Sequence, residues 1–248
     1  MRDCLVWMEK ITKRFGTITA LENVDFGVDR GEVRALLGDN GAGKSTLIKI
    51  LMGVYPPTTG QIYFEGRPVS INSPREAREQ GIEAVYQDLA LVNLMSISRN
   101  FFLGRELVQK AGPFQWLDLK KMNELCRKSL HDIGIKIRSS SERVGSLSGG
   151  ERQSIAIGRG VYFGAIVLIL DEPTSALSVA ETRKVLTYIT NARERGLAVI
   201  YITHNVGHVY QVADSYTIIR HGRLVGTYAK GELSQDDIAD LITGDREH

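Results

Sequence analysis

The sequence predicts an α/β fold with a mostly parallel sheet, an N-terminal antiparallel β subdomain and a helical subdomain. Two short apolar runs, 166–170 and 197–202, flank a polar helical pattern at 179–195, which is typical of buried parallel strands covered by helices. The opening third alternates β-rich stretches with glycine turns, and the middle of the chain has a mostly helical pattern. We expect residues 1–248 to form a single domain, with the helical subdomain inserted at about 92–163.

The N-terminal part is predicted to be rich in strands. Strands are predicted at 5–11, 20–28 and 61–64, with turns at Gly16, Gly31 and Gly60. These strands are expected to pair in an antiparallel manner. A further strand at 32–37 leads through a glycine-rich turn into a helix with Leu47, Ile48 and Leu51 on one face.

The segment from about residue 95 to residue 163 is predicted to be mostly helical. Gly112 and Pro113 mark one loop, and clustered serines and glycines mark another at 139–148. The strand 166–170, the helix 179–195 and the strand 197–202 complete the predicted order.

Composition and charge exclude several classes of function. The 31 Lys and Arg residues and 29 Asp and Glu residues leave a net charge of +2, spread along the chain, so nothing favours nucleic acid as a partner. The longest apolar run, 161–170, is about half the length of a membrane-spanning helix, and the first ten residues lack the apolar stretch of a secretory signal. Any membrane role is therefore expected to depend on a partner. Cys4 and Cys126 are expected to be free thiols.

The strongest motif is GDNGAGKS at residues 38–45, between a predicted strand and a predicted helix. This is the spacing of a phosphate-binding P-loop, so the core is expected to be that of a P-loop NTPase that binds ATP. Backbone N–H groups would surround phosphate oxygens, Lys44 would act catalytically on the terminal phosphates, and Ser45 would bind Mg²⁺. The predicted nucleotide-binding residues of this segment are Gly38, Asp39, Asn40, Gly41, Ala42, Gly43, Lys44, Ser45 and Thr46.

Two carboxylates, Asp171 and Glu172, follow the predicted strand 166–170. Parallel sheets bind ligands at this end of their strands. Asp171 is suited to hold Mg²⁺, and Glu172 is suited to orient and polarise an attacking water as the catalytic carboxylate. Taken alone, the pair also fits a helix cap or a solvated surface. The P-loop in the same chain favours the catalytic interpretation.

A second helix start, LSGGE at residues 147–151, offers exposed amides and a serine hydroxyl. A plain helix N-cap has the same features. The segment resembles the signature motif of ABC ATPases, and the three motifs occur in the order found in that family. In that family two domains pack head to tail. The resemblance therefore implies a homodimer formed on ATP binding, in which Ser148, Gly149 and Gly150 contact a nucleotide held by the partner subunit.

The resemblance assigns roles to three more residues. Gln87 would lie in the loop that meets Mg²⁺ and a membrane subunit, and Phe15 would stack on adenine. His204 would contact the γ-phosphate and help to position Glu172 for catalysis. Without the resemblance, a single Gln, Phe or His at these places also fits a surface or packing role. His208 and His221 match no motif and are assigned to the surface or to packing.

The chain departs from the family pattern at several positions. Glu151 stands where many members have Gln, and Ser178 stands where the common pattern has Asp. Gly158 and Gly160 lie inside the helix predicted after the signature motif, and each costs about 1 kcal/mol relative to Ala, so this helix is expected to be less stable than usual. Hydrolysis is still expected, since Glu172 and His204 are present.

Three segments, 38–41, 84–91 and 176–182, are most similar to the bacterial carbohydrate-uptake branch, which includes ribose, xylose, arabinose and fructose systems. With one ATPase domain, the chain resembles the single-domain, fructose-type members. The resemblance implies a peripheral ATPase subunit on the cytoplasmic face of the cell membrane that powers sugar import. Its partners would be membrane-spanning permease subunits and an external sugar-binding protein, which would set the transported substrate.

Two other functions remain open. A soluble ABC-type ATPase that acts on DNA or ribosomes would share the nucleotide motifs, although long coiled coils, zinc-binding cysteines or tandem domains would be expected with it. An ATP-gated regulatory subunit would be expected to lack Glu172 or His204.

The segment 89–104 has two interpretations. Its apolar residues would form either a docking surface for the membrane subunits or part of the core. These residues are Leu91, Val92, Leu94, Met95, Ile97, Phe101, Phe102 and Leu103.

Overall fold

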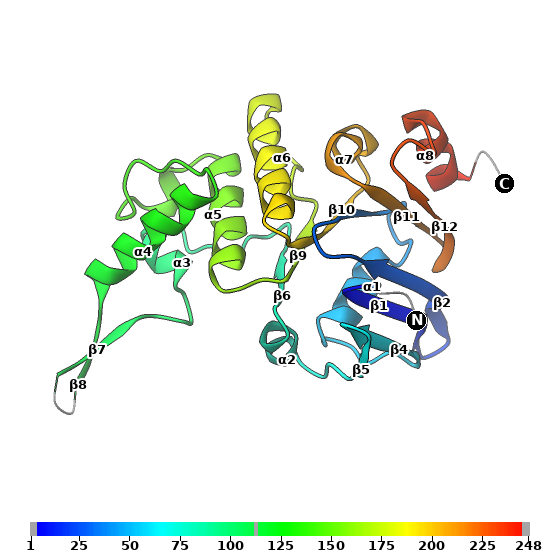
Figure 1. The fold of residues 1–248 in the computed structure, drawn as a ribbon, viewed down its shortest axis with the longest axis horizontal. Helices are drawn as coiled ribbons and strands as arrows, with labels where there is room; N and C mark the ends of the chain where they lie inside the picture. The colour runs from blue at the N-terminus through cyan, green and yellow to red at the C-terminus, as the bar shows by residue number, and fades with distance from the viewer. Residues whose placement is uncertain (1–3, 112–113, 245–248) are drawn as a thin grey trace.

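The computed structural model describes residues 4–111 and 114–244, which form a four-stranded and a six-stranded sheet with a shared core, and a helical region with a two-stranded sheet beside them (Figure 1). The predicted loop at Gly112 and Pro113 lies outside the described residues. The elements are β1 (Val6–Phe15), β2 (Ile18–Val28), β3 (Val33–Leu37), α1 (Lys44–Leu51), β4 (Thr59–Phe64), β5 (Arg67–Val69), α2 (Pro74–Glu79), β6 (Ile82–Val85), α3 (Ile97–Phe101), β7 (Val108–Ala111), β8 (Phe114–Leu117), α4 (Leu119–Asp132), a 3₁₀ turn (Val144–Ser146), α5 (Gly149–Tyr162), β9 (Val167–Asp171), α6 (Val179–Glu194), β10 (Ala198–Thr203), α7 (Val206–Val212), β11 (Ser215–Arg220), β12 (Arg223–Ala229) and α8 (Gln235–Thr243). In the described ranges, no helix combines the length and the apolar character needed to cross a bilayer.

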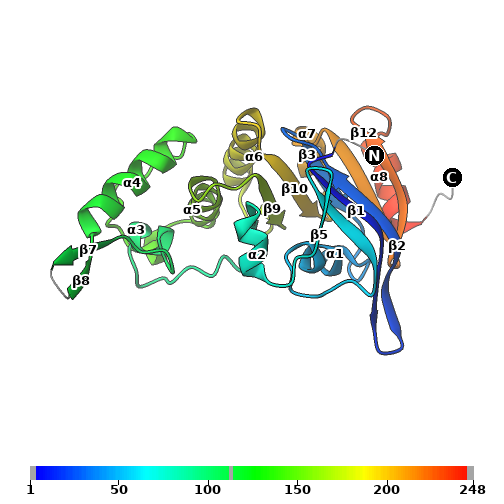
Figure 2. The same cartoon turned by 60° about the horizontal axis from the view of Figure 1, so that its bottom comes forward.

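The N-terminal sheet is antiparallel, as predicted, with the strand order β2-β1-β4-β5. Gly16 has φ 58°, a conformation that favours glycine, and it turns β1 into β2. The resulting β1–β2 hairpin extends beyond the neighbouring strands (Figure 2). Its inner face, which includes Met8 and Phe26, is buried against α1.

The main sheet has six strands in the order β12-β11-β3-β10-β9-β6. All neighbours pair in parallel except β11 and β12, which form an antiparallel hairpin. The predicted strands at 32–37, 166–170 and 197–202 correspond to β3, β9 and β10. The mostly parallel sheet is therefore confirmed.

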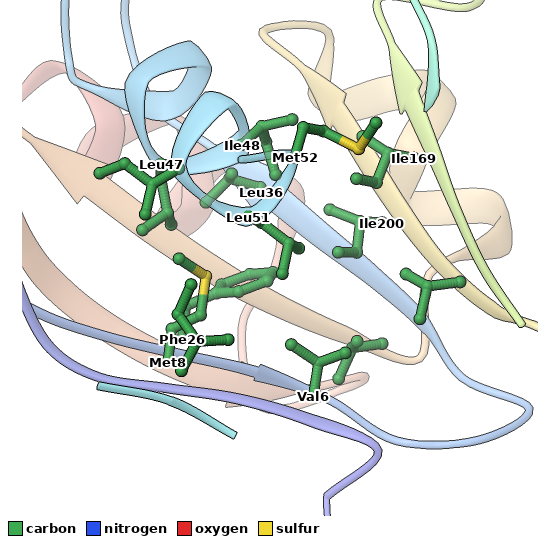
Figure 3. Packing of buried hydrophobic residues seen from close by; sticks show 14 of the residues in the cluster. Val6, Met8, Phe26, Leu36, Leu47, Ile48, Leu51, Met52, Ile169 and Ile200 are labelled. Atoms are coloured by element: carbon green, nitrogen blue, oxygen red, sulfur yellow. The ribbon is translucent and has the colours of Figure 1, made fainter. Parts of the chain in front are cut away.

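The main sheet is buried on both faces, which explains why β9 and β10 are apolar except for their last residues. On one face, Leu36, Ile169 and Ile200 pack towards α1 and the antiparallel sheet (Figure 3). The predicted apolar face of α1, formed by Leu47, Ile48 and Leu51, lies in this core. The alternate residues of the same strands contribute to a second core on the other face, together with α6, α7 and α8.

A third core joins α3, α4 and α5. Phe101, the last residue of α3, and Phe102 directly after it pack there against Tyr162 and Phe163, with ring centroids 5.2–6.2 Å apart. The apolar residues of the segment 89–104 are divided between two environments. Ile97, Phe101 and Phe102 are fully buried, whereas Leu94 is 81% exposed.

The prediction that residues 95–163 are mostly helical was wrong for one part of that segment. Strands β7 and β8 form a two-stranded antiparallel hairpin, which projects from the end of the helical region (Figure 1). The aromatic and β-branched residues Val108, Phe114 and Trp116 favour strands over helix.

Gly158 and Gly160 allow α5 to pack closely against its neighbours. A Cβ atom at Gly158 would lie 2.5 Å from Leu130 Cδ2 on α4, and one at Gly160 would lie 3.0 Å from Leu168 Cδ1 on β9. Both glycines are buried inside a continuous helix of 14 residues. The two glycines therefore lower the helix propensity of α5, but they allow close packing that a larger side chain would disturb.

Candidate functional site

The four candidate catalytic segments lie at one edge of the main sheet. Strands β3, β10, β9 and β6 are parallel neighbours, so their carboxyl ends meet at the same edge. The P-loop follows β3, His204 follows β10, Asp171 ends β9 with Glu172 directly after it, and Gln87 follows β6. The fold therefore brings together groups that are up to 166 residues apart in sequence.

The P-loop depends on its glycines. Gly38, Gly41 and Gly43 have φ values of 152°, 79° and 107°, which side chains rarely adopt. A Cβ atom at Gly38 would overlap the carbonyl oxygen of Ile219, and one at Gly43 would lie 2.9 Å from the carbonyl oxygen of Ala20. Residues 40–46 and Ala20 line a hollow of about 190 Å³ at the start of α1.

Lys44 is a buried cation held inside this loop. Its Nζ donates hydrogen bonds to the carbonyl oxygens of Gly38 (2.7 Å) and Asp39 (3.0 Å). Burial lowers the pKa of Lys44, while the nearby carboxylates Glu172 and Asp171 act in the opposite direction. Ser45, the next residue of α1, is exposed, and Thr46 is half-buried.

The Glu172 carboxylate is held through both of its oxygens. Oε2 accepts a hydrogen bond from Thr203 Oγ1 (2.9 Å), and Oε1 accepts one from the backbone N–H of His204 (3.1 Å). His204 Nδ1 also lies 2.7 Å from Oε1, and a proton on Nδ1 makes this contact a third hydrogen bond. The Glu172 side chain is 16% exposed and that of His204 is 62% exposed, so the pair lies at the surface of the sheet edge.

Asp171 is half-buried beside Glu172. Burial raises the pKa of Asp171, the neighbouring charge of Glu172 raises it further, and Lys44 lowers it. Two carboxylates and one ammonium group therefore interact in a site with limited access to water. Such a charge arrangement is typical of functional sites.

Gln87 and Phe15 lie at the border of this region. Gln87 is exposed two residues after β6, whose Val85 pairs with Leu170 directly before Asp171. Phe15 ends β1 and is 42% exposed. Its ring meets that of Tyr55 edge to face, with 5.3 Å between centroids, and the Lys13 ammonium lies 5.1 Å from the ring centre.

The signature segment, residues 147–151, lies apart from the P-loop. Ser148 caps α5: its hydroxyl accepts from Glu151 N (3.3 Å), and its own backbone N–H donates to Glu151 Oε2 (2.9 Å). Helix α5 packs against α4 and α6, and β9 separates it from α1 in both views (Figures 1 and 2). Ser148, Gly149 and Gly150 therefore do not join the P-loop of their own chain.

The structure adds residues to the site that sequence reasoning missed. Thr203 holds Glu172, and Glu181 accepts a hydrogen bond from the backbone N–H of Gly150 (3.2 Å). The S-x-x-E spacing of Ser178 and Glu181 indicates a capping box, but nothing local predicts the contact with Gly150. His208 Nδ1 lies 3.1 Å from the buried hydroxyl of Thr174, in keeping with the packing role assigned to it.

Known proteins are similar to this chain along most of its length. The family model described as ABC transporter matches residues 21–175. The xylose/arabinose import ATP-binding protein XylG of Sulfolobus acidocaldarius is 44% identical over 96% of this chain and 94% of its own length. The fructose import ATP-binding protein FrcA of Rhizobium meliloti is 43% identical over 96% of this chain and 93% of its own length. The ribose import ATP-binding protein RbsA of Caldanaerobacter subterraneus is 39% identical over 97% of this chain, which spans 48% of that protein.

Solved structures share the fold. A nucleotide-free ATP-binding cassette from an ABC transporter superposes with a TM-score of 0.82 at 23% identity, over 97% of this chain and 95% of that one. A dimeric bacterial ABC transporter cassette superposes with a TM-score of 0.73 at 21% identity, over 92% of this chain and all of that one. With a family match over residues 21–175 and relatives of 43–44% identity along nearly its whole length, this chain belongs to the ABC transporter family.

Proposed function

We propose that this chain binds and hydrolyses ATP and thereby powers the import of a sugar through an ABC transporter. The observation that carries the ATPase proposal is the Glu172 carboxylate, which Thr203 and His204 hold at the sheet edge that also bears the P-loop. The sugar proposal rests on the relatives named for xylose/arabinose and fructose import, which match nearly the whole chain.

Each site residue has a task in this reaction. The N–H groups of the P-loop and the Lys44 ammonium stabilise charge on the phosphate oxygens. Glu172 orients and polarises the attacking water. His204 holds Glu172 and reaches the γ-phosphate, while Phe15 stacks on adenine. Fixed groups of this kind stabilise the transition state without reorganisation during the reaction.

The residues at this edge also fit Mg²⁺. The Ser45 hydroxyl, the Asp171 carboxylate and the Gln87 side-chain carbonyl are hard oxygen donors, which Mg²⁺ prefers. A bound Mg²⁺ would supply positive charge that neutralises the phosphates of ATP. Asp171 has a raised pKa from burial and from Glu172, and a cation beside it would favour its ionised form.

We further propose that two copies of the chain pair on ATP binding. Each nucleotide would lie between one subunit's P-loop and the partner's Ser148, Gly149 and Gly150. The separation of α5 from α1 within one chain supports this assignment (Figure 1). A nucleotide bound at the P-loop, at the start of α1, would lie away from the signature segment of the same chain. ATP must then bind the paired state more tightly than the free subunits.

The proposed partners are membrane-spanning permease subunits and an external sugar-binding protein, and the proposed location is the cytoplasmic face of the membrane. We assign residues 1–248 to one ABC-type ATPase domain with a helical subdomain at about 92–163, supported by the separate core of α3, α4 and α5. A groove of about 370 Å³ between β6 and α5 is the proposed docking site of the permease. It is lined in part by Tyr86, Leu89, Leu91, Leu103, Arg105 and Arg159.

Size-exclusion chromatography and an ATPase assay of Glu172→Gln test this function. The variant is expected to lose hydrolysis and to form a dimer with Mg-ATP and not with Mg-ADP. Glu194→Gln, an exposed carboxylate at the end of α6, is the matched control and should hydrolyse normally. Normal hydrolysis by Glu172→Gln would remove Glu172 from the catalytic role. An active wild type whose Glu172→Gln variant stays monomeric with ATP would contradict pairing of the isolated subunits.

A further inference from the structure

One carboxylate connects the starts of two helices. Glu181 Oε2 accepts hydrogen bonds from the backbone N–H (3.0 Å) and the hydroxyl (2.8 Å) of Ser178, the N-cap of α6. Its other oxygen, Oε1, accepts from the backbone N–H of Gly150 at the start of α5 (3.2 Å). The two helix starts therefore share a single anion, with one oxygen serving each.

The glycine at position 150 makes this contact possible. A Cβ atom there would lie 2.7 Å from Glu181 Cβ and 2.9 Å from its Cγ, so a side chain would push the carboxylate away. Gly150 itself is buried, whereas Ser148 and Gly149 are exposed. The N–H group of Gly150 is thus enclosed on one side by Glu181.

Glu181 also brings a permanent negative charge. Hydrogen bonds from the Ser148 side chain, from Ser178 and from the Gly150 amide lower the pKa of Glu181 to about 2. The carboxylate is therefore ionised at neutral pH. It occupies a helix N-terminus, where backbone amides and the helix dipole stabilise anions.

We propose that Glu181 is a positioning residue that holds the Gly150 amide in the free subunit and gives it up to the partner's nucleotide when two subunits pair. This inference rests on the proposed function, in which ATP bridges the P-loop of one subunit and the signature segment of the other. The exchange leaves α6 capped, because Ser178 keeps its bonds to Oε2 and only the bonds from the Gly150 amide and the Ser148 side chain have to break. Glu181 thereby sets the ATP concentration at which the subunits associate.

The sign of the effect follows from charge. Phosphate and carboxylate compete for the same N–H group, and both are anions, so the retained Glu181 charge opposes nucleotide binding at this helix start. Glutamine keeps the shape of the side chain and can still accept hydrogen bonds, but it carries no charge. Removing the charge should therefore ease association, whereas loss of a purely structural cap should weaken it.

The experiment uses Glu172→Gln as the parent, because it is expected not to hydrolyse ATP. Light scattering during a Mg-ATP titration gives the concentration for half-maximal dimerisation. Adding Glu181→Gln should lower that concentration by up to about fivefold, the effect of one charge at a helix start. The matched control is Asp237→Asn, which neutralises the acid of the Ser234–Asp237 capping box in α8 and should leave the concentration unchanged.

A salt series provides a second readout. Salt screens charges, so the difference between the parent and Glu181→Gln should shrink as ionic strength rises, which loss of a structural cap would not cause. If the parent dimerises and Glu181→Gln leaves the concentration unchanged or raises it, the inference is wrong and the proposed function stands. If the parent binds ATP and stays monomeric, the proposed pairing of isolated subunits is wrong, and the inference falls with it.

Discussion

Thr203 and His204 fix the Glu172 carboxylate from successive positions at the end of β10. Glu172 has φ 50°, an uncommon backbone conformation for a residue with a side chain. Thr203 is fully buried and makes the hydrogen bond to Oε2, whereas the exposed His204 binds Oε1. Water therefore competes less with the hydrogen bond from the buried Thr203 than with the one from the exposed His204.

Replacing Thr203 with Val tests this anchor. Valine keeps the shape of the side chain and removes the donor to Oε2. A hydrogen bond to a charged group contributes about 1.5–3 kcal/mol, so we expect kcat to fall about tenfold or more with little change in the KM for ATP. Steady-state ATPase assays measure both values.

Thr217→Val is the matched control, because Thr217 is also buried and its hydroxyl lies 3.3 Å from that of Thr227, away from the site. Its kcat should remain close to that of the wild type. An unchanged kcat in Thr203→Val would mean that His204 alone orients Glu172.

Site residues that belong to local motifs could be predicted from the sequence, because a P-loop or two acids after an apolar strand require only neighbouring residues. Thr203 and Glu181 could not. Each acts on a residue 31 positions away, at Glu172 and Gly150 respectively. Such contacts depend on which strands and helices become neighbours in the fold. The spacing of residues along the sequence does not predict this.

Helix α5 is positioned by its glycines. Gly158 faces Leu130 of α4, which is fully buried. Glycine at position 158 lowers the helix propensity of α5 but allows α5 to pack closely against α4.

Gly158→Ala is expected to destabilise the protein even though alanine is the better helix former. Overpacking against Leu130 costs about 1–3 kcal/mol, and the gain in helix propensity is about 1 kcal/mol, which leaves a net loss of about 1 kcal/mol. Urea unfolding followed by circular dichroism measures this change. Gly160→Ala, whose Cβ would lie 3.0 Å from one Leu168 methyl group, should lose less. A more stable Gly158→Ala protein would show that α4 can shift away.

At the scale of elements, strongly patterned segments were predicted correctly and short or unusual ones were missed. Strands β9 and β10 are nearly continuous apolar runs, β3 is apolar except for Arg34, and α1 follows from the P-loop. Strand β6 has only four residues, one of them Glu83, and its place at the edge of the main sheet comes from its pairing with β9. The β7–β8 hairpin escaped detection because the helical patterns on either side of it dominate that segment.

For the whole molecule, ATP is expected to raise thermal stability, because it binds only the folded chain. At 100 times the dissociation constant the gain is about 2.7 kcal/mol, or about 5–10 °C in melting temperature for a chain of this size. Differential scanning fluorimetry with Mg-ATP measures the shift.

Lys44→Ala should lose most of this shift, since the variant lacks the buried cation of the P-loop. Lys121→Ala, an exposed lysine on α4, should keep it. A full shift in Lys44→Ala would place the bound nucleotide elsewhere.

The order of strands in the main sheet also determines when each strand can pair while the chain is being synthesised. Strand β3, which precedes the P-loop, has β10 and β11 as its neighbours, so residues 33–37 gain both partners only after residues 198–220 have left the ribosome. Strands that are far apart in sequence pair slowly, and an apolar strand that is still unpaired is prone to aggregation. The nascent chain therefore carries an incomplete nucleotide site until most of its length has been made, and early termination before β10 leaves β3 and β9 without the strand that joins them.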